Sequence, residues 1–278
     1  MIRPVLEGVA PVRGLGLWLL SRRHPSEVEL DGQVFRVDPR DFGVTLELHS
    51  TGTYEPFARG ICLERLKPGM VFLDIGSHVG LYALPAARAV GPTGRVVAFE
   101  PHPGNRALLQ ENVQRNGLDN VTIVPAAVSD QAGNMELQVS PFNTGDHRLY
   151  RGRGNRGGGV PTPVVSIDEW CRAEGIEQVD MVKIDVQGAE AKVLEGMRGV
   201  IASSGDMSII LEYSPWMLRE AEATPIDVLD QLVEAGFSLA TLDEAEAVLE
   251  SASAQEIDRA CPGRSYVNIL ATRESGAP

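Results

Sequence analysis

Short apolar runs alternate with amphipathic stretches along most of the chain. Runs of four to six residues, bounded by glycine or polar residues, are typical of strands buried in a parallel sheet. They cover 71–75, 95–100, 121–124, 181–185, 209–212, 237–241 and 266–271. Between them, apolar residues recur at helical spacing over 56–66, 81–90, 105–116, 167–174, 189–198 and 226–235. This alternation predicts an α/β fold with a mainly parallel seven-stranded sheet, helices on both faces, and a last strand that can pair antiparallel.

An appendage precedes the repeating pattern. Residues 27–37 alternate as strands do, with Asp31-Gly32 at the centre, which is a strong hairpin signal. The apolar run 14–20 is too short to span a membrane and predicts a packing or lid helix. We therefore expect a helix and hairpin over 1–53, followed by one domain over 54–278.

An insertion interrupts the main domain. Two alternating runs flank the glycine-rich segment 151–159, which suits neither a helix nor a strand. We expect an inserted β-hairpin over about 135–165 in the predicted fold.

Composition narrows the class of protein. The 38 acidic residues outnumber the 25 basic ones, so the net charge is -13 and the chain repels polyanions such as nucleic acids. Cys62, Cys171 and Cys261 have neither the number nor the spacing of a disulfide framework or a zinc site. We expect a cytoplasmic protein without a membrane span that acts on a small molecule, and a homodimer remains open.

The residues after the first strand suit a ligand site, because ligands bind at the carboxyl ends of parallel strands. Asp74, Gly76, Ser77 and Gly80 follow that strand. Glycine lets the backbone approach a ligand, a helix start offers free amides to a carboxylate, and Asp74 can receive an ammonium group. The alternative is a structural turn in which Ser77 caps the next helix.

Glu100 ends the second strand, about 20 residues beyond Gly80, where nucleoside-binding α/β folds place an acid against ribose hydroxyls. An NAD-dependent oxidoreductase uses the same acid. Its GxGxxG fingerprint is absent, however, because the loop has a wider gap between Gly76 and Gly80.

Taken in order, several motifs resemble the FkbM-type methyltransferases, a Rossmann-like class that uses S-adenosylmethionine. The motifs are Asp74-Ile75-Gly76-Ser77-His78-Val79-Gly80, Phe99-Glu100-Pro101 with Asn105, and Val182-Lys183-Ile184-Asp185-Val186-Gln187-Gly188-Ala189-Glu190. Tyr54-Glu55, Leu66-Lys67-Pro68-Gly69, Ala127-Val128-Ser129-Asp130 and Asn268-Ile269-Leu270 extend the similarity from about Tyr54 to Leu270.

The resemblance assigns the cofactor site. It implies that Asp74, Gly76 and Gly80 surround the methionine part, Glu100 the ribose, Ala127, Val128 and Asp130 the adenine edge, and that Asp185 lies beside the methyl group. Residues of the same motifs complete the predicted cofactor set, namely Glu55, Ser77, His78, Pro101 and Asn105.

Methyl transfer to oxygen is an in-line displacement, which needs a positioned acceptor and often a base. The candidates are Asp185, Glu212 and His147, of which Asp185 is best placed and His147 has the most suitable ordinary pKa. Lys183 shares a sheet face with Asp185 and joins the catalytic candidates, although the two can also form a structural ion pair. A divalent-metal clamp between Asp185 and Glu212 is less favoured because no third ligand is evident.

The insertion is the candidate acceptor site. Its arginines Arg151, Arg153 and Arg156 suit an acidic or sugar-like substrate, and Asn143 can contribute a polar contact. The alternative is that this part of the insertion is a solvated loop tip that binds no substrate. Gln187 is a further substrate-binding candidate, at a position where the family often has Glu.

The principal hypothesis is thus an S-adenosylmethionine-dependent O-methyltransferase acting on a hydroxyl or carboxyl of a sugar, polyketide or related metabolite. The alternatives are a non-catalytic S-adenosylmethionine-binding protein and an NAD-type oxidoreductase.

Overall fold

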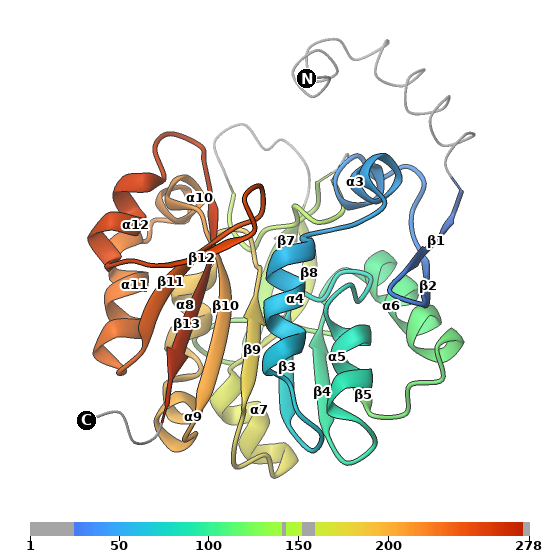
Figure 1. Ribbon diagram of the computed structural model, residues 1–278, viewed down its shortest axis with the longest axis horizontal. Helices are drawn as coiled ribbons and strands as arrows, with labels where there is room; N and C mark the ends of the chain where they lie inside the picture. Colours follow the sequence, from blue (N-terminus) through green and yellow to red (C-terminus); the bar gives the residue numbers. More distant parts are fainter. Residues whose placement is uncertain (1–24, 141–142, 152–158, 275–278) are drawn as a thin grey trace.

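The computed structural model describes residues 25–140, 143–151 and 159–274. Its main sheet has eight strands, and five neighbouring strands of it run parallel (Figure 1). The order across the sheet is β12 (Val248–Ser251), β11 (Ser238–Asp243), β13 (Val267–Arg273), β10 (Met207–Tyr213), β9 (Met181–Ile184), β3 (Val71–Ile75), β4 (Arg95–Phe99) and β5 (Val121–Val124). The predicted mainly parallel α/β sheet is confirmed, and β13 pairs antiparallel with both β10 and β11 as expected.

The sheet has one strand more than the predicted seven. The extra strand is β12, which pairs antiparallel with β11 at the edge of the sheet. All four of its residues are exposed. Hydrophobic patterning detects strands through their buried positions, so an edge strand that buries nothing is not visible in the sequence.

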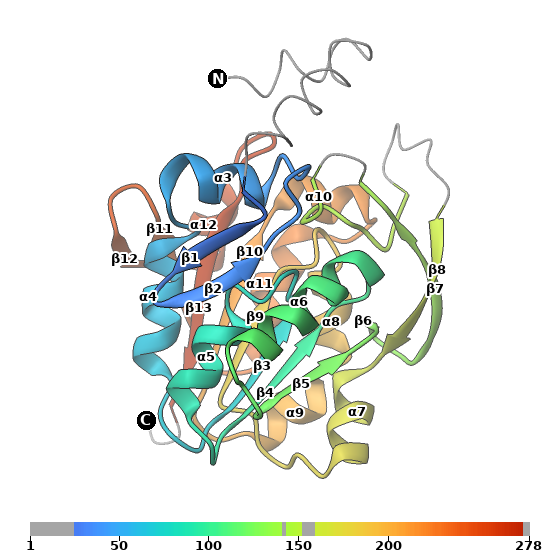
Figure 2. The same cartoon turned by 90° about the vertical axis from the view of Figure 1, so that its right-hand side faces the viewer.

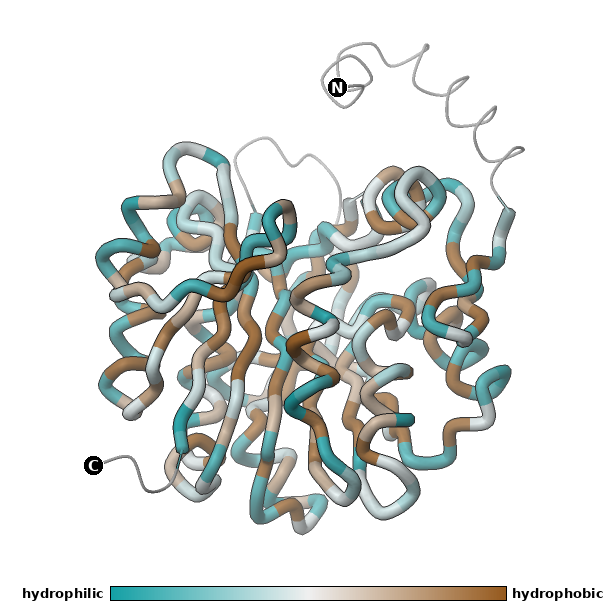
Figure 3. The backbone as a smooth tube through the Cα atoms, in the orientation of Figure 1, coloured by the Kyte–Doolittle hydropathy of each residue, from teal (hydrophilic) through white to brown (hydrophobic). Residues whose placement is uncertain are grey.

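Helices cover both faces of the sheet, as expected (Figures 1 and 2). One face packs against α3 (Val44–Thr51), α4 (Pro56–Arg65), α5 (Ala83–Val90) and α6 (Pro103–Arg115). The other packs against α7 (Ile167–Glu174), α8 (Glu190–Glu195), α9 (Arg198–Ser203), α10 (Pro215–Glu220), α11 (Pro225–Glu234) and α12 (Ala254–Ala260). Figure 3 shows the resulting apolar strands at the centre of the molecule.

Several helix boundaries differ from the expected ones for local reasons. Helix α5 begins at Ala83 rather than residue 81, so Pro85 lies in the first turn, where a missing N–H group costs little. The expected helix over 189–198 ends early, and α9 follows separately. A Cβ at Gly196 would lie 2.1 Å from the carbonyl oxygen of Ser129, so the chain packs there through glycine.

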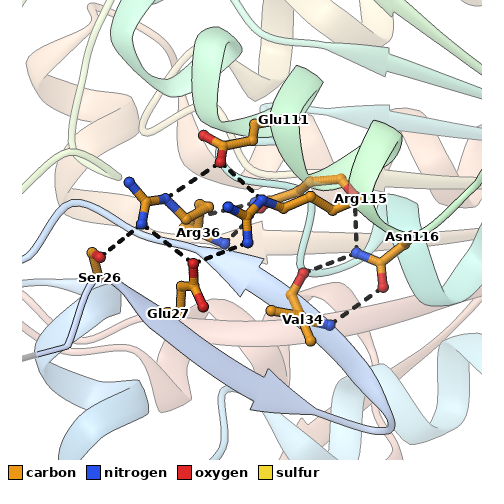
Figure 4. A network of polar contacts seen from close by, with 8 residues as sticks. Ser26, Glu27, Val34, Arg36, Glu111, Arg115 and Asn116 are labelled. Atoms are coloured by element: carbon orange, nitrogen blue, oxygen red, sulfur yellow. Dashed lines mark hydrogen bonds and ion pairs between the residues drawn. The ribbon is translucent and has the colours of Figure 1, made fainter.

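The predicted N-terminal hairpin is present as β1 (Glu27–Leu30) and β2 (Gln33–Arg36), with positive φ angles at Asp31 and Gly32. Figure 4 shows the hairpin held against α6. The amide of Asn116 donates to the carbonyl oxygen of Val34 at 2.8 Å and accepts from its N–H group at 3.3 Å. Ion pairs of Glu27, Arg36, Glu111 and Arg115 surround these bonds. The hairpin therefore packs on the domain, although the boundary at residue 53 stays a prediction, and the expected helix over 14–20 lies outside the described residues.

The predicted inserted hairpin is also present. Strands β7 (Gly133–Gln138) and β8 (Gly159–Val165) pair antiparallel, and β6 (Ala127–Val128) joins β8 in a separate three-stranded sheet beside β5 (Figure 2). Leu137 and Val164 are buried beneath it. This small sheet brings the segment 143–151 over the carboxyl ends of the main strands.

Candidate active site

The carboxyl ends of the parallel strands form the upper edge of the sheet in Figure 1. Residues that follow these ends line one cleft. The space within it, part of which is open to solvent, is about 530 Å³. The loops after β3, β4, β6 and β9 form one side and the insertion forms the other. The lining residues are Ile75, Gly76, His78, Phe99, Glu100, Pro101, Asn105, Ala127, Val128, Leu137, Thr144, Gly145, His147, Leu149, Asp185, Val186 and Gln187.

The loop after β3 is held by backbone contacts to the neighbouring strands. The N–H groups of Gly76 and Ser77 donate to the carbonyl oxygen of Phe99 at 3.0 and 3.1 Å. Gly76 has a φ of 89°, and a Cβ there would lie 2.0 Å from the carbonyl oxygen of Asp185. Glycine therefore lets the loops after β3 and β9 touch at the base of the cleft.

Other predicted residues of this loop lie behind the cleft wall. A Cβ at Gly80 would meet Leu84 and Leu109, so that glycine serves core packing. The Ser77 hydroxyl donates to the carbonyl oxygen of Asp74 at 2.7 Å. Because α5 starts only at Ala83, with Tyr82 at its N-cap position, Ser77 is not its cap, and contact of that helix start with a ligand carboxylate stays a prediction.

Glu100 is buried at the floor of the cleft, after β4. One carboxylate oxygen accepts from the His78 N–H group at 2.9 Å, and the other accepts from the His102 N–H group at 2.8 Å. Burial raises the pKa of Glu100 to about 8, although these two hydrogen bonds oppose the shift. Each oxygen keeps a lone pair for a further donor, as a ribose diol would require.

Two of the three residues predicted to contact the adenine edge line the cleft. Ala127 and Val128 line the cleft, whereas Asp130 does not. Its carboxylate lies 3.2 Å from the Lys192 ammonium and accepts from the Ser129 hydroxyl at 2.8 Å. Asn105 lines the cleft, and its amide donates to the Thr144 carbonyl oxygen at 2.9 Å, which ties α6 to the insertion.

Two histidines, His78 and His147, line the cleft together with Glu100. His78 Nε2 lies 2.7 Å from the Thr144 hydroxyl, and His147 packs its ring 4.2 Å from that of His102. Burial, followed by the nearby His102 and His78, lowers the pKa of His147 to about 3. This setting argues against His147 as a base, because a base with so low a pKa holds a proton weakly at neutral pH.

The opposite end of the cleft is crowded with charge. Lys183 is buried, and its ammonium lies 3.7 Å from one carboxylate oxygen of Asp185. Burial alone would lower the pKa of Lys183, but the carboxylates of Asp185, Glu55, Glu212 and Asp74 outweigh it and raise that pKa. The cluster therefore has more carboxylates than ammonium groups.

Gln187 joins two of these carboxylates. Its amide nitrogen donates to Asp185 at 2.6 Å and to Glu212 at 3.0 Å. The residue has a φ of 56°, an uncommon conformation for a side chain of this kind. Glu212 is buried, and burial together with the adjacent Asp185 raises its pKa well above the ordinary value. Glu212 thus holds a proton more tightly than an exposed glutamate does.

Glu55 and Asp74 complete the cluster on the side of α4 and α5. Glu55 accepts from the Tyr82 hydroxyl at 2.7 Å and from the Asn268 amide at 3.0 Å. Burial raises the pKa of Asp74 to about 7, and its Oδ2 atom has no hydrogen-bond partner in the described part of the chain. Neither carboxylate belongs to the cleft wall, so direct contact of Asp74 with a ligand stays a prediction.

The predicted substrate residues of the insertion lie apart from the cleft. Arg151 is exposed and pairs with Glu136 at 2.8 Å, and Asn143 turns its amide oxygen to the N–H group of Gly145. Arg153 and Arg156 lie outside the described residues. Of the predicted substrate contacts, Gln187 is the one that lines the cleft.

An aromatic wall near Gln187 was not predicted. A Cβ at Gly188 would lie 2.8 Å from the Tyr150 ring, so Tyr150 abuts the loop after β9. The Arg148 guanidinium lies 5.8 Å from the Tyr150 ring centroid and 5.4 Å from that of Trp216, which joins the insertion to α10. The sequence offered one signal for these aromatic residues, because Trp216 follows the carboxyl end of a predicted strand by a few residues.

A metal centre has no support among residues 25–140, 143–151 and 159–274, where no group of three or more His, Cys, Asp or Glu side chains could hold an ion. No helix in these same ranges is long and apolar enough to cross a membrane.

Comparisons with known proteins point to one family. A family model described as the methyltransferase FkbM domain matches residues 74–239, which is more than half of the chain. The 2-O-methyltransferase NoeI of Sinorhizobium fredii is 28% identical over 181 residues, which are 60% of this chain and 72% of NoeI. The hexuronic acid methyltransferase AglP of Haloferax volcanii is 28% identical over 64% of this chain and 67% of its own length. The 31-O-demethyl-FK506 methyltransferase FkbM of Streptomyces tacrolimicus is 30% identical over 48% of this chain and 61% of its own length.

Proposed function

This chain belongs to the FkbM methyltransferase family, and from that premise we propose that it methylates an oxygen atom of a small molecule, at a hydroxyl or carboxyl group. It is an S-adenosylmethionine-dependent methyltransferase, as its family membership and its methyltransferase relatives establish. The observation that carries the proposal further is that Asp185 and Glu100, which follow the strands on either side of β3, line one cleft.

The cleft fits S-adenosylmethionine on two counts. The cofactor carries an ammonium and a sulfonium group, and the carboxylates of Asp185 and Glu55 outnumber the single ammonium of Lys183 beside them. At the other end, the lone pairs left on Glu100 suit ribose hydroxyls, and the apolar edge of Ala127 and Val128 suits a purine ring. When bound, the cofactor supplies an electrophilic methyl group.

Asp185 is the candidate that would take the acceptor proton. Its carboxylate lines the cleft, with Lys183 near one oxygen and the Gln187 amide on the other. These contacts would hold it in one orientation, and positioning contributes much of the catalysis in a displacement of this kind. Glu212 would instead stay protonated and, through Gln187, help to orient Asp185. Lys183 would act by positioning rather than by contact with the acceptor.

A sugar or related hydroxylated metabolite is the acceptor class that the relatives favour, because AglP is named for a hexuronic acid and NoeI for a 2-O position. In this chain the acceptor would enter beside Gln187, against the wall of Tyr150, Arg148 and Trp216. Aromatic side chains with a few fixed polar groups are typical of such sites. A nucleic acid is disfavoured by the net charge of -13.

The cellular compartment and the oligomeric state are also proposals. Cys62, Cys171 and Cys261 are free and buried, which suits a reducing compartment such as the cytoplasm. A homodimer that involves the first 53 residues also remains a proposal, and sedimentation of the full chain would test it.

Titration calorimetry with S-adenosylmethionine, S-adenosylhomocysteine and NAD tests the cofactor assignment. We expect the first two to bind and NAD to give no heat above dilution. Binding of NAD alone would overturn the proposal. Methyl transfer from labelled cofactor to uronic acids, neutral sugars and polyketide alcohols would then separate an enzyme from a binding protein that lacks turnover.

A further inference from the structure

The imidazole of His147 has a defined tautomer. Its Nδ1 atom accepts a hydrogen bond from the backbone N–H group of Ser140 at 3.1 Å. A backbone N–H can only donate, so Nδ1 carries no hydrogen. A neutral His147 ring must therefore carry its hydrogen on Nε2, and that atom is a donor.

The surroundings of the ring keep it neutral. His102, His78 and burial all disfavour the imidazolium form of His147, and the nearest ring is that of His102 at 4.2 Å. The Nδ1 atom of His102 is itself directed to the N–H group of Asn105, at 3.4 Å. No carboxylate of the described residues is among the groups that shift the pKa of His147, and burial, His102 and His78 all lower that pKa.

The Nε2 donor has no partner in the described part of the chain. The atom is shielded from solvent and has no hydrogen bond to any described residue, although His147 lines the cleft. A buried donor without an acceptor has a cost in stability. A ligand atom that accepts a hydrogen bond would remove this cost.

The position of His147 identifies the part of the ligand. Its ring packs on His102, and the backbone N–H groups of His102 and His78 hold the two oxygens of Glu100. Asp185 and Gln187, by contrast, belong to the other end of the cleft. His147 therefore lies at the end where Glu100 and Val128 would meet the nucleoside.

We infer that His147 is a cofactor-binding residue, which donates a hydrogen bond from Nε2 to an acceptor atom of the nucleoside half of S-adenosylmethionine. The inference rests on the proposed function and replaces the prediction that His147 acts as a base. The insertion would then also contact the cofactor, through a residue that lies outside the motifs shared with the FkbM-type methyltransferases.

Two substitutions distinguish the roles of the two ring nitrogens of His147. His147→Asn keeps an acceptor near the position of Nδ1 and removes the Nε2 donor, whereas His147→Gln places an amide donor near Nε2. By calorimetry, we expect His147→Asn to weaken binding of S-adenosylhomocysteine about 5- to 20-fold, the effect of one lost hydrogen bond. His147→Gln should recover most of that affinity. 5′-Methylthioadenosine, which lacks the amino acid end, should show the same ratio.

Nitrogen chemical shifts of ¹⁵N-labelled histidine give a readout that is independent of affinity. They should report the Nε2–H tautomer in the free protein, with Nε2 moving on addition of S-adenosylhomocysteine. An Nδ1–H tautomer, or equal affinity of wild type and His147→Asn, would overturn the inference. His49→Asn, on α3 outside the cleft, is the control. Failure of the wild type to bind S-adenosylhomocysteine would instead refute the proposed function.

Discussion

The two ends of the cleft bury polar groups by different means. Around Glu100, His78 and His147 the groups are held by neutral hydrogen bonds, several of them from the backbone. Around Asp185 and Lys183, ionisable side chains compensate one another. Neutral bonds are nearly independent, whereas buried charges depend on all their neighbours. Substitutions at the charged end should therefore cost more than those at the neutral end.

Asp185→Asn should have the largest effect. The variant keeps the shape of the side chain but removes its capacity to take a proton, so turnover should fall about 10²- to 10⁴-fold. Single-turnover rates with saturating cofactor measure the loss, and calorimetry with S-adenosylhomocysteine checks that the cofactor still binds. Asp227→Asn, on the exposed surface of α11, is the matched control. Unchanged turnover would remove Asp185 from the reaction.

Lys183→Met should cost most in stability. Removing one partner of a buried ionic cluster typically lowers the free energy of unfolding by about 3–5 kcal/mol. We expect this loss in urea titrations at pH 8. It should shrink toward pH 5.5, where the surrounding carboxylates can take up protons instead.

Lys192→Met removes a half-exposed ammonium that pairs with Asp130 and should cost less than about 1 kcal/mol. If both lysine variants lost the same stability, the charged end would not differ from the surface.

Gln187→Glu tests the amide between Asp185 and Glu212. The change replaces a donor by a third carboxylate, so we expect the free energy of unfolding to fall by about 1–3 kcal/mol. Three carboxylates together can hold a divalent cation, and Mg²⁺ should therefore raise the melting temperature of this variant but not of the wild type. Gln178→Glu makes the same exchange at an exposed glutamine that donates to Asp180, and it should show neither effect.

At the neutral end, Glu100→Ala should weaken cofactor binding by about 1–3 kcal/mol, because its hydrogen bonds to the ribose hydroxyls are lost. Calorimetry with S-adenosylhomocysteine measures this change directly. Cofactor affinity equal to that of the wild type would contradict the assignment of Glu100.

The raised pKa of Glu100 also has a pH signature. The folded protein keeps the proton up to about pH 8, whereas the unfolded chain loses it near the ordinary value of 4.5. The folded state binds more protons between these values, so the free energy of unfolding should fall as the pH rises from 4.5 to 8. Glu100→Gln should flatten that part of the profile for the cofactor-free protein, and an unchanged slope would place the titration elsewhere.

Arg151→Ala should have the smallest effect. The side chain is exposed and its ion pair with Glu136 is open to solvent, so the change in stability should stay within about 0.5 kcal/mol. The KM for the acceptor should also be unchanged. A large rise in KM would restore the sequence-based hypothesis that Arg151 binds the substrate.

Much of the fold could be predicted because its cause is local. The strands β3 and β5 and the helix α7 match the expected ranges, since each is a bounded apolar run or an amphipathic period. The hairpin at Asp31-Gly32 follows from the backbone preferences of two residues. Helix α3 and strand β12 were missed, because neither combines a clear period with a buried face.

The candidate site was predicted as a set of strand ends, and the set is largely brought together. The order of motifs along the chain determined that Gly76, Glu100, Val128 and Asp185 would share one edge of a sheet, because carboxyl ends of parallel strands must meet there. The face on which each side chain lies was harder to predict. Asp74, near the end of β3, is buried, and Gly80, in the same loop as Gly76, packs against Leu84 and Leu109.

The sequence by itself thus determined the α/β class, the edge that carries the site and the family of the chain, since these depend on periodicity and on ordered motifs. Only the tertiary structure decided which groups are bases, donors or structural charges. Ser140 sets the tautomer of His147, and Gln187 joins Asp185 to Glu212. Proton affinity and hydrogen-bond direction depend on burial and on neighbours that are distant in sequence, and no local pattern records them.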